Sequence, residues 1–335
     1  MKAKTQEINA EVEAKPFYKR GWFKNSLIAA TCVGMGCVAG LLGAMAFKDP
    51  IIQTVTNGSS FEVDEAYMKQ ALATYNAAKE DGKPFSEVLS PDQMVNLAYS
   101  FFEQQENTYT IGIGSSKAMG VVDQVIQSCT VKNGDKYFEE SNSISSFVKI
   151  YNRMYEEGNT TTTYFGSNSD YSSHPQEEMT NEQYAEMMGR TVSDPLTYIV
   201  SPTTVADSET SLSGDGGTLA KQNEDGTYTV DIELKKISKS DGSEYMPGVA
   251  NYQKQMKSIS GLTAYPNFAY CHLSFVLDSD LLPIKMVSHE KYEAKMSMGI
   301  SISANCEGRL TTHYIDEDRQ IPSLDEKIDY SAYAE

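Results

Sequence analysis

The sequence predicts an α+β fold in which a long, curved antiparallel sheet follows a single transmembrane helix. Three observations lead to this fold class. An uncharged apolar run occupies residues 26–47, two stretches with helical spacing follow it, and most of the remaining chain alternates between apolar and polar residues. Helices followed by a series of antiparallel strands are the order typical of α+β domains. We therefore expect one folded domain over residues 61–315.

Residues 26–47 form the predicted transmembrane helix. The run contains no charged residue, and Lys24 and Lys48 border it. As a helix it would be about 33 Å long, which is enough to cross a bilayer core of ~30 Å. Six Lys and Arg residues precede it, against three acidic residues. The positive-inside rule then places residues 1–25 in the cytoplasm as a tail, and residues 48–60 outside as a linker to the domain.

A cleaved signal peptide is the alternative to this anchor. Ala44-Met45-Ala46 matches the A-x-A cleavage pattern, so the mature protein would be secreted after cleavage following Ala46. The charged leader and the apolar run are both longer than in a typical signal peptide, which favours a retained single-pass anchor in the cell membrane. Both interpretations place the domain outside the membrane.

The overall charge limits the classes of partner. The chain has 335 residues and a net charge of −18, and the basic N-terminal tail makes the remainder more acidic still. An acidic exterior argues against nucleic acid as a partner and against binding to anionic lipid surfaces.

Two helices are predicted at the start of the domain. The first covers residues 61–79, and Asp81-Gly82-Lys83-Pro84 ends it. The second starts after Ser90, which is suited to cap it, with Pro91 in the first turn.

Strands dominate after residue 106. Period-two alternation predicts that one face of each strand is covered and the other is wet. Polar stretches at 166–178 and 203–226 are predicted to be loops, and the acidic segment 316–335 is expected to be a partly ordered tail. Short helices are predicted at 180–188, where Thr180 and Gln183 form a capping box, and at 249–259. The predicted strands are 109–114, 121–131, 136–140, 146–155, 160–165, 228–234, 269–277, 283–292 and 296–314. An Asn133-Gly134 turn is predicted to join the second of these strands to the third.

Three cysteines lie beyond the membrane segment: Cys129, Cys271 and Cys306. In an oxidising compartment they allow one disulfide and one free thiol. Cys271 and Cys306 each share a face with the apolar residues of their strands, which predicts a disulfide between them. The alternative is two buried free thiols that behave as small hydrophobic side chains.

The sequence carries no catalytic signature that makes a positive case for an enzyme. The chain has four histidines, and none falls in an H-E-x-x-H motif. It has no G-x-S-x-G elbow, no nucleotide-binding glycine fingerprint and no EF-hand loop. We therefore predict no enzymatic activity, no cofactor and no metal site.

The order of elements in the second half resembles a known superfamily. GTYTVDIELKK begins at Gly226, a short helical stretch follows, and then come YCHLSFVLDSDLLPIKMVSHEKY and a long strand that ends in ISANCEGRLTTHY. With the earlier VKNGDKYFEE hairpin, this arrangement over about residues 85–315 resembles the LolA/LppX-like superfamily of exported lipid- and lipoprotein-binding proteins. The resemblance implies a curved antiparallel β half-barrel, covered by helices, around an apolar cavity. Members are soluble or lipid-anchored, so a membrane helix is a departure from the family that puts shuttling between membranes in doubt.

Two functions remain open. The first is a membrane-anchored extracytoplasmic binding protein that holds a lipid or another apolar ligand in the half-barrel. The second is a cell-envelope scaffold or sensor domain that binds protein partners, and an exported enzyme is a weaker third. Under the first, the ligand contacts one concave apolar face, which must be covered by protein helices or by a ligand. The predicted ligand-binding residues are Tyr228, Val230, Ile232, Leu234, Leu273, Phe275, Met298, Ile300 and Ile302.

Overall fold

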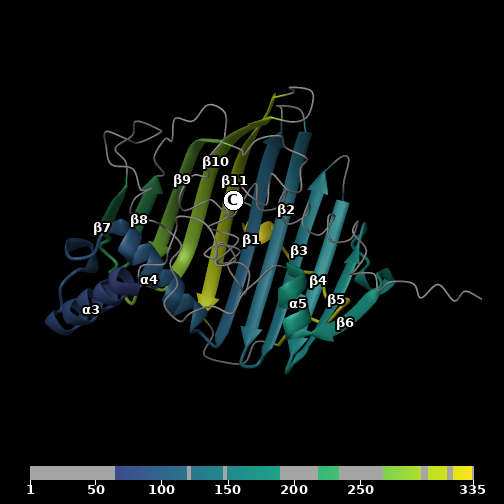
Figure 1. Cartoon of the computed structure of the whole chain (residues 1–335), viewed down its shortest axis with the longest axis horizontal. Coiled ribbons are helices and arrows are strands. Elements are labelled where there is room, and N and C mark those ends of the chain that lie inside the picture. The colour runs from purple at the N-terminus through teal and green to yellow at the C-terminus, as the bar shows by residue number, and fades with distance from the viewer. Residues whose placement is uncertain are drawn as a thin grey trace, which may run out of the picture.

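The fold is organised around one open antiparallel sheet of 11 strands (Figure 1). It is seen in a computed structural model that describes residues 65–118, 122–145, 149–188, 218–233, 267–295, 301–314 and 320–333. The strand order is β6-β5-β4-β3-β2-β1-β11-β10-β9-β8-β7. The first strand therefore pairs with the last in the middle of the sheet, and the sheet is not closed because β6 and β7 form its two edges.

Each of the nine predicted strands has a counterpart in the structure, and six of them are longer than the alternation alone indicated. The structure adds β6 and β7 within segments that were predicted to be loops. The strands are β1 Asn107–Ala118, β2 Val122–Asn133, β3 Lys136–Ser145, β4 Lys149–Glu157, β5 Thr160–Gly166, β6 Gln176–Thr180, β7 Leu219–Gln222, β8 Tyr228–Glu233, β9 Asn267–Leu277, β10 Pro283–Lys295 and β11 Ser301–Tyr314. The β2–β3 turn is Gly134-Asp135 rather than Asn133-Gly134, and Gly134 supplies the positive φ of 58° that this position requires.

The described helices are α3 Glu65–Asp81, α4 Pro91–Glu103 and α5 Asn181–Met188, with short 3₁₀ turns η3 Phe85–Glu87, η4 Tyr171–Ser173 and η6 Ser331–Tyr333. Two of the described helices, α4 and α5, begin where their capping residues predict. Ser90 caps α4 in a capping box with Gln93. The predicted Thr180–Gln183 box is confirmed, because each backbone N–H donates to the other residue's side-chain oxygen, at 3.0 and 3.1 Å.

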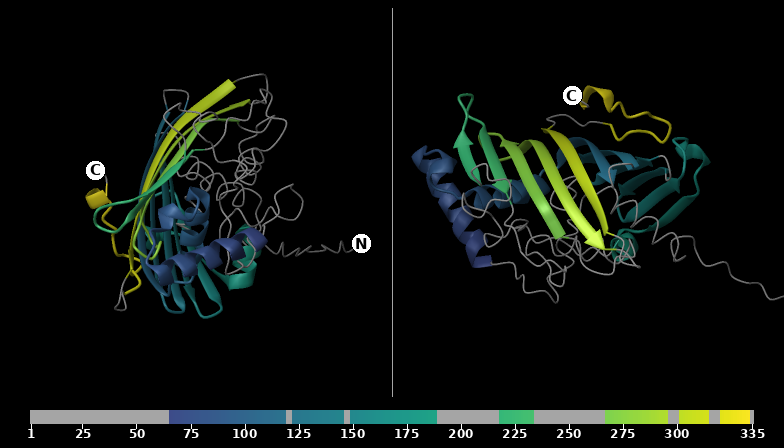
Figure 2. Two further views of the ribbon diagram at one scale, coloured as in Figure 1. Left: turned by 90° about the vertical axis from the view of Figure 1, so that its left-hand side faces the viewer. Right: turned by 90° about the horizontal axis from the view of Figure 1, so that it is seen from above.

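The sheet has an inner face and an outer face, and different parts of the chain cover them. Figure 2 shows α3, α4 and α5 on the concave side, which we call the inner face, and the C-terminal segment on the opposite side, the outer face. At the β8 end of the inner face, Phe85 of η3 stacks on Tyr75 of α3 with ring centroids 4.7 Å apart. Met94 and Leu97 of α4 are fully buried.

On the outer face, residues 320–333 form an ordered segment that we call the C-terminal strap. Tyr330 is buried in a cluster with residues of β1, β2 and β3, and Ile321, Ile328 and Tyr333 pack against the same cluster. The sheet residues of this cluster are Tyr109, Ile111, Cys129, Val131 and Phe138. Residues 320–333, which belong to the acidic segment that was expected to be a partly ordered tail, therefore pack against the sheet. The apolar residues that anchor the strap are spaced out in an otherwise acidic segment. The composition of the segment therefore did not indicate that it packs on the sheet.

Other predictions fall on residues that the structure does not describe. These are the transmembrane helix at 26–47, the linker at 48–60 and the helix at 249–259. Within the described ranges, no helix has both the length and the apolar character needed to span a bilayer.

Candidate functional site

Five of the nine predicted ligand-binding residues form one apolar wall on the inner face. Tyr228, Val230 and Ile232 lie in β8, and Leu273 and Phe275 lie in β9. All five are buried, and the register sets Val230 opposite Phe275 and Ile232 opposite Leu273. Strand periodicity placed them together, because alternate residues share a face.

The other four predicted residues are less informative. Leu234, Met298 and Ile300 lie outside the described residues, and Ile302 is in β11 opposite Ala294. The wall nevertheless continues onto β10 through a residue that was not predicted, because buried Met286 lies opposite Phe275.

Protein side chains cover the β8 end of this wall. The Phe85 ring lies 5.5 Å from the Tyr228 ring, measured between centroids, and the backbone N–H of Phe85 donates to Tyr228 Oη at 3.2 Å. The apolar face was expected to be covered either by protein helices or by a ligand. At β8 the protein itself provides the cover.

The wall ends on β10 at two buried polar side chains. Ser288 lies opposite Leu273, and Glu290 lies two residues further along the same face. Glu290 is 2% exposed and Ser288 is fully buried. Among the residues that the structure describes, the Ser288 hydroxyl and both carboxyl oxygens of Glu290 have no hydrogen-bond partner. Burial raises the pKa of the Glu290 carboxyl well above its usual value, which favours the protonated, neutral form.

The neighbours of Glu290 correct the predicted disulfide. Glu290 lies opposite Cys271 of β9 on one side and opposite Cys306 of β11 on the other. The two cysteines are therefore two strand spacings apart, about 9.5 Å, which exceeds the ~6.8 Å limit between the Cα atoms of a disulfide. Both are buried free thiols, as is Cys129. The prediction treated β9 and β11 as neighbours, whereas β10 lies between them.

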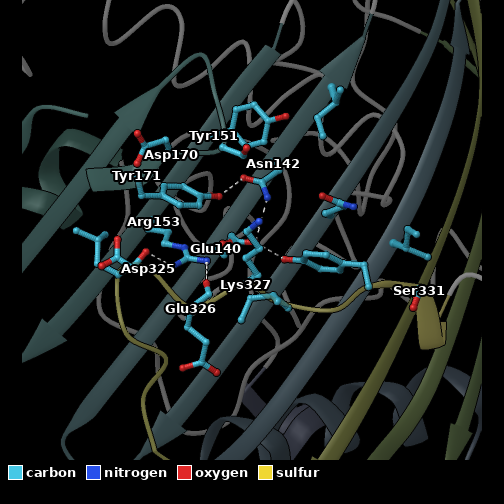
Figure 3. A pocket seen from close by; sticks show the side chains of 17 residues that line it. Glu140, Asn142, Tyr151, Arg153, Asp170, Tyr171, Asp325, Glu326, Lys327 and Ser331 are labelled. Carbon is cyan, nitrogen blue, oxygen red and sulfur yellow. Dashed lines mark hydrogen bonds and ion pairs between the residues drawn. The ribbon is translucent and has the colours of Figure 1, made fainter. Parts of the chain in front are cut away.

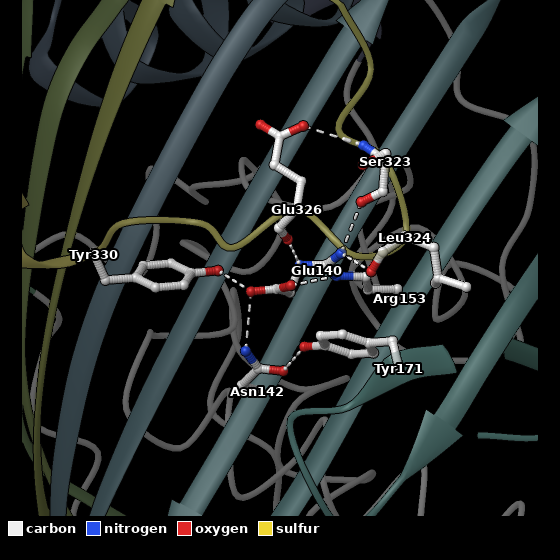
Figure 4. A network of polar contacts seen from close by, with 8 residues as sticks. All are labelled: Glu140, Asn142, Arg153, Tyr171, Ser323, Leu324, Glu326 and Tyr330. Carbon is white, nitrogen blue, oxygen red and sulfur yellow. Dashed lines mark hydrogen bonds and ion pairs between the residues drawn. The ribbon is translucent and has the colours of Figure 1, made fainter. Parts of the chain in front are cut away.

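The outer face carries a buried ion pair that the sequence analysis missed (Figure 4). Arg153 Nε of β4 lies 2.5 Å from Glu140 Oε2 of β3, and their side chains are 2% and 4% exposed. The other oxygen of Glu140 accepts from Asn142 Nδ2 at 3.0 Å and from Tyr330 Oη at 2.8 Å. The Tyr171 hydroxyl donates to Asn142 Oδ1 at 2.7 Å.

Arg153 also binds the main chain of the strap. Nη1 donates to the carbonyl oxygens of Ser323 at 3.0 Å and Leu324 at 2.6 Å, and Nη2 donates to that of Glu326 at 2.6 Å. The guanidinium carbon lies 4.1 Å from the centroid of the Tyr171 ring. Burial alone would lower the pKa of Arg153, but the Glu140 carboxylate outweighs burial and raises it. The guanidinium therefore stays charged and joins β3, β4 and the strap.

A pocket of about 760 Å³ lies beside this network, between the strap and the sheet (Figure 3). Its floor is a cross-strand row in which Ile113, Gln127, Asn142 and Tyr151 follow one another on β1, β2, β3 and β4. The strap covers the adjacent row of the sheet, which contains Glu140 and Arg153. The pocket lies next to the strap, over the row that the strap does not cover. Its size falls within the range of small-molecule sites.

A local signal for the outer site is present in the sequence. Glu140 shares its strand face with Phe138, and Arg153 shares its face with Tyr155. Arg153 lies between Tyr151 and Tyr155 on this face, directly opposite Glu140, and opposite charges flanked by aromatic residues point to a buried pair. The strap's part in the site has no such signal, because it contacts Arg153 through backbone carbonyls.

A second polar cluster lies on the outer face at β8 and β9. His272 Nδ1 lies 3.2 Å from Glu233 Oε1, and Nε2 lies 3.5 Å from Asp231 Oδ1. Hydrogen bonding to Asp231 raises the pKa of His272, partly opposed by burial. Across the part of the chain that the structure describes, no three His, Cys, Asp or Glu side chains are placed to hold a metal ion.

Comparisons with known proteins assign no family. No protein-family model and no curated protein matches the chain. Among solved structures, one titled "De novo design of transmembrane beta-barrels" is similar at 6% identity over 63% of this chain and 98% of that chain, with a TM-score of 0.18. "GphF Dehydratase 1" is similar at 8% identity over 75% of this chain and 87% of that chain, with a TM-score of 0.12. Likenesses this weak carry no argument about fold or function.

Proposed function

We propose that this chain is a non-enzymatic, membrane-anchored extracytoplasmic binding protein that holds an amphiphilic ligand on the inner face of its sheet. The apolar part of the ligand lies along the wall formed by residues such as Leu273, Phe275 and Met286. A hydrogen-bonding group of the ligand, such as an amine, hydroxyl or amide, lies at Glu290 and Ser288. An open, curved sheet with helices on its concave side agrees with the architecture that the LolA/LppX-like resemblance implies.

The observation that carries the proposal is the unsatisfied Glu290 carboxyl at the end of an apolar wall. A buried polar group without a partner costs ~1–3 kcal/mol, and such groups are rare in native structures. Next to it, Gly308 of β11 lies opposite Gly114 of β1, so the inner face carries no side chain at these two positions. A ligand group that hydrogen-bonds Glu290 would remove the penalty.

Ligand extraction tests this proposal. The full-length chain is purified, examined by native mass spectrometry and extracted with organic solvent. We expect a bound amphiphile in the wild type. Glu290→Met should lose most of it while the fold is as stable as the wild type or more so, because the variant removes the unpaired carboxyl. Ser128→Ala, which changes another buried hydroxyl on the same face, is the matched control and should retain the ligand.

Two results would count against the carrier. If the wild type yields no extractable amphiphile and binds no lipid probe, the ligand proposal fails. If Glu290→Met retains the amphiphile, the position of its polar group is wrong.

The second candidate is an envelope scaffold or sensor domain that binds protein partners. The observation in its favour is the cover of Phe85 over Tyr228, because side chains of the chain itself close that end of the wall. A face filled along its whole length would leave no room for a ligand.

A further inference from the structure

We propose that the outer-face pocket beneath the C-terminal strap is a second binding site, and that it takes a basic segment of a partner polypeptide. This site is independent of the inner-face ligand, because it lies on the opposite side of the sheet. Three properties of the pocket support this assignment: the way its wall is held, its charge and the hydrogen-bonding groups on its floor.

Side chains of the pocket wall are held by hydrogen bonds and ring packing within the chain itself. Glu140 and Asn142 are 3% and 4% exposed, and each is held by hydrogen bonds to neighbours on other elements. The Tyr171 ring packs against Arg153 on one side and meets the Tyr151 ring edge-on, with centroids 6.3 Å apart. Because these side chains are already ordered, binding would not have to immobilise them.

The charge of the lining favours a cationic occupant. Four carboxylates and two cations line the pocket, and Arg153 is fully engaged with Glu140 and the strap carbonyls. The remaining charges in the lining are one cation, Lys327, and three carboxylates, those of Asp170, Asp325 and Glu326. Figure 3 shows Asp170 and Asp325 at the end of the pocket where Tyr171 lies. A Lys or Arg side chain placed there would make charge-assisted hydrogen bonds to both carboxylates.

The floor offers groups that suit a peptide main chain. The Gln127 amide and the Tyr151 hydroxyl line the pocket, and neither makes a hydrogen bond to any described residue. An amide can both donate and accept, as the backbone of an extended peptide requires. The adjacent row already binds an extended segment through its carbonyls, in the contact between Arg153 and the strap. A peptide laid along the strap is the occupant that this arrangement fits best.

Peptide binding to matched variants tests the inference. The purified full-length chain is titrated with short, end-capped, fluorescent peptides that differ only in carrying lysine, glutamine or glutamate at their central positions. We expect the lysine peptide to bind, with an affinity that falls as salt is added. Asp170→Asn combined with Asp325→Asn should weaken it about tenfold or more. The control combines Asp123→Asn with Asp135→Asn, two exposed carboxylates outside the pocket, and should leave binding unchanged.

Several outcomes would overturn the inference. These are equal binding of all three peptides, no binding of the lysine peptide, or an equal loss in the control variant. Binding of an N-acetylglucosamine oligomer but of no peptide would assign the pocket to a neutral glycan instead. The pocket variant should keep any co-purifying amphiphile, so failure here is distinct from failure of the inner-face proposal.

Discussion

Arg153 and Glu140 form a salt bridge of 2.5 Å between neighbouring strands, and both side chains are almost completely shielded from water. The pair is also one point at which the C-terminal strap attaches to the sheet, because Arg153 binds three carbonyl oxygens of the strap and Glu140 accepts from the Tyr330 hydroxyl. A buried pair of this kind is weak support for stability in itself, but loss of one partner leaves an uncompensated buried charge.

Arg153→Met should therefore destabilise the domain by about 3–5 kcal/mol, measured by urea unfolding. Adding Glu140→Leu to Arg153→Met should recover much of the loss, because no charge is then left buried. Arg309→Met is the matched control. Its pair with Glu307 is 2.8 Å long but 42% and 41% exposed, so the cost should stay below about 1 kcal/mol. Equal costs at the two sites would mean that the Arg153 pair is solvated.

The strap should be released by changes at Tyr330. Tyr330→Phe removes the hydrogen bond to Glu140 and should cost about 1.5 kcal/mol. Tyr330→Ala also empties the cluster around Ile111 and Phe138, and should make residues 320–333 sensitive to limited proteolysis at a protease level that leaves the wild type intact. Tyr333→Phe is the control, since no described hydrogen bond involves that hydroxyl. A strap that stays protected in Tyr330→Ala would show that its other contacts, to Arg153 and through Ile321, Ile328 and Tyr333, hold it without Tyr330.

His272 should make stability depend on pH near neutrality. Asp231 and Glu233 favour the charged imidazole, so the pKa of His272 is higher in the folded state than its ordinary ~6.5. The stabilisation is fully present below the unfolded pKa and is lost as pH rises through the folded pKa. His272→Gln should flatten this part of a plot of urea midpoint against pH.

The cysteines should react as buried thiols. Without a reductant, native protein treated with iodoacetamide should show little alkylation at Cys129, Cys271 and Cys306, and unfolded protein should show full alkylation at all three. Peptide mapping without reduction would contradict the strand order if it found Cys271 linked to Cys306. Such a link would require β10 to move from between them.

The sequence correctly predicted features that depend only on residues close together in the chain, such as helix caps and the covered face of a strand. The Thr180–Gln183 box depends on residues three apart, and the shared face of Val230 and Ile232 depends on the two-residue period of a strand. The positions of β8, β9 and β10 follow from the same alternation. Short β6 and β7 were missed because their sequences are polar edge strands, which lack the apolar alternation of a covered strand.

Tertiary structure alone decided which of these elements lie side by side. β10 separates Cys271 from Cys306 and brings Glu290 between them, which no periodicity within one strand can indicate. The strap joins Arg153 to Ser323 and Glu326, about 170 residues later, through carbonyl oxygens that every residue type carries. Sequence patterns report the period of an element and its exposed face. Pairing between distant segments depends on the packing of the whole chain, and here both the unsatisfied carboxyl and the outer pocket arise from such pairing.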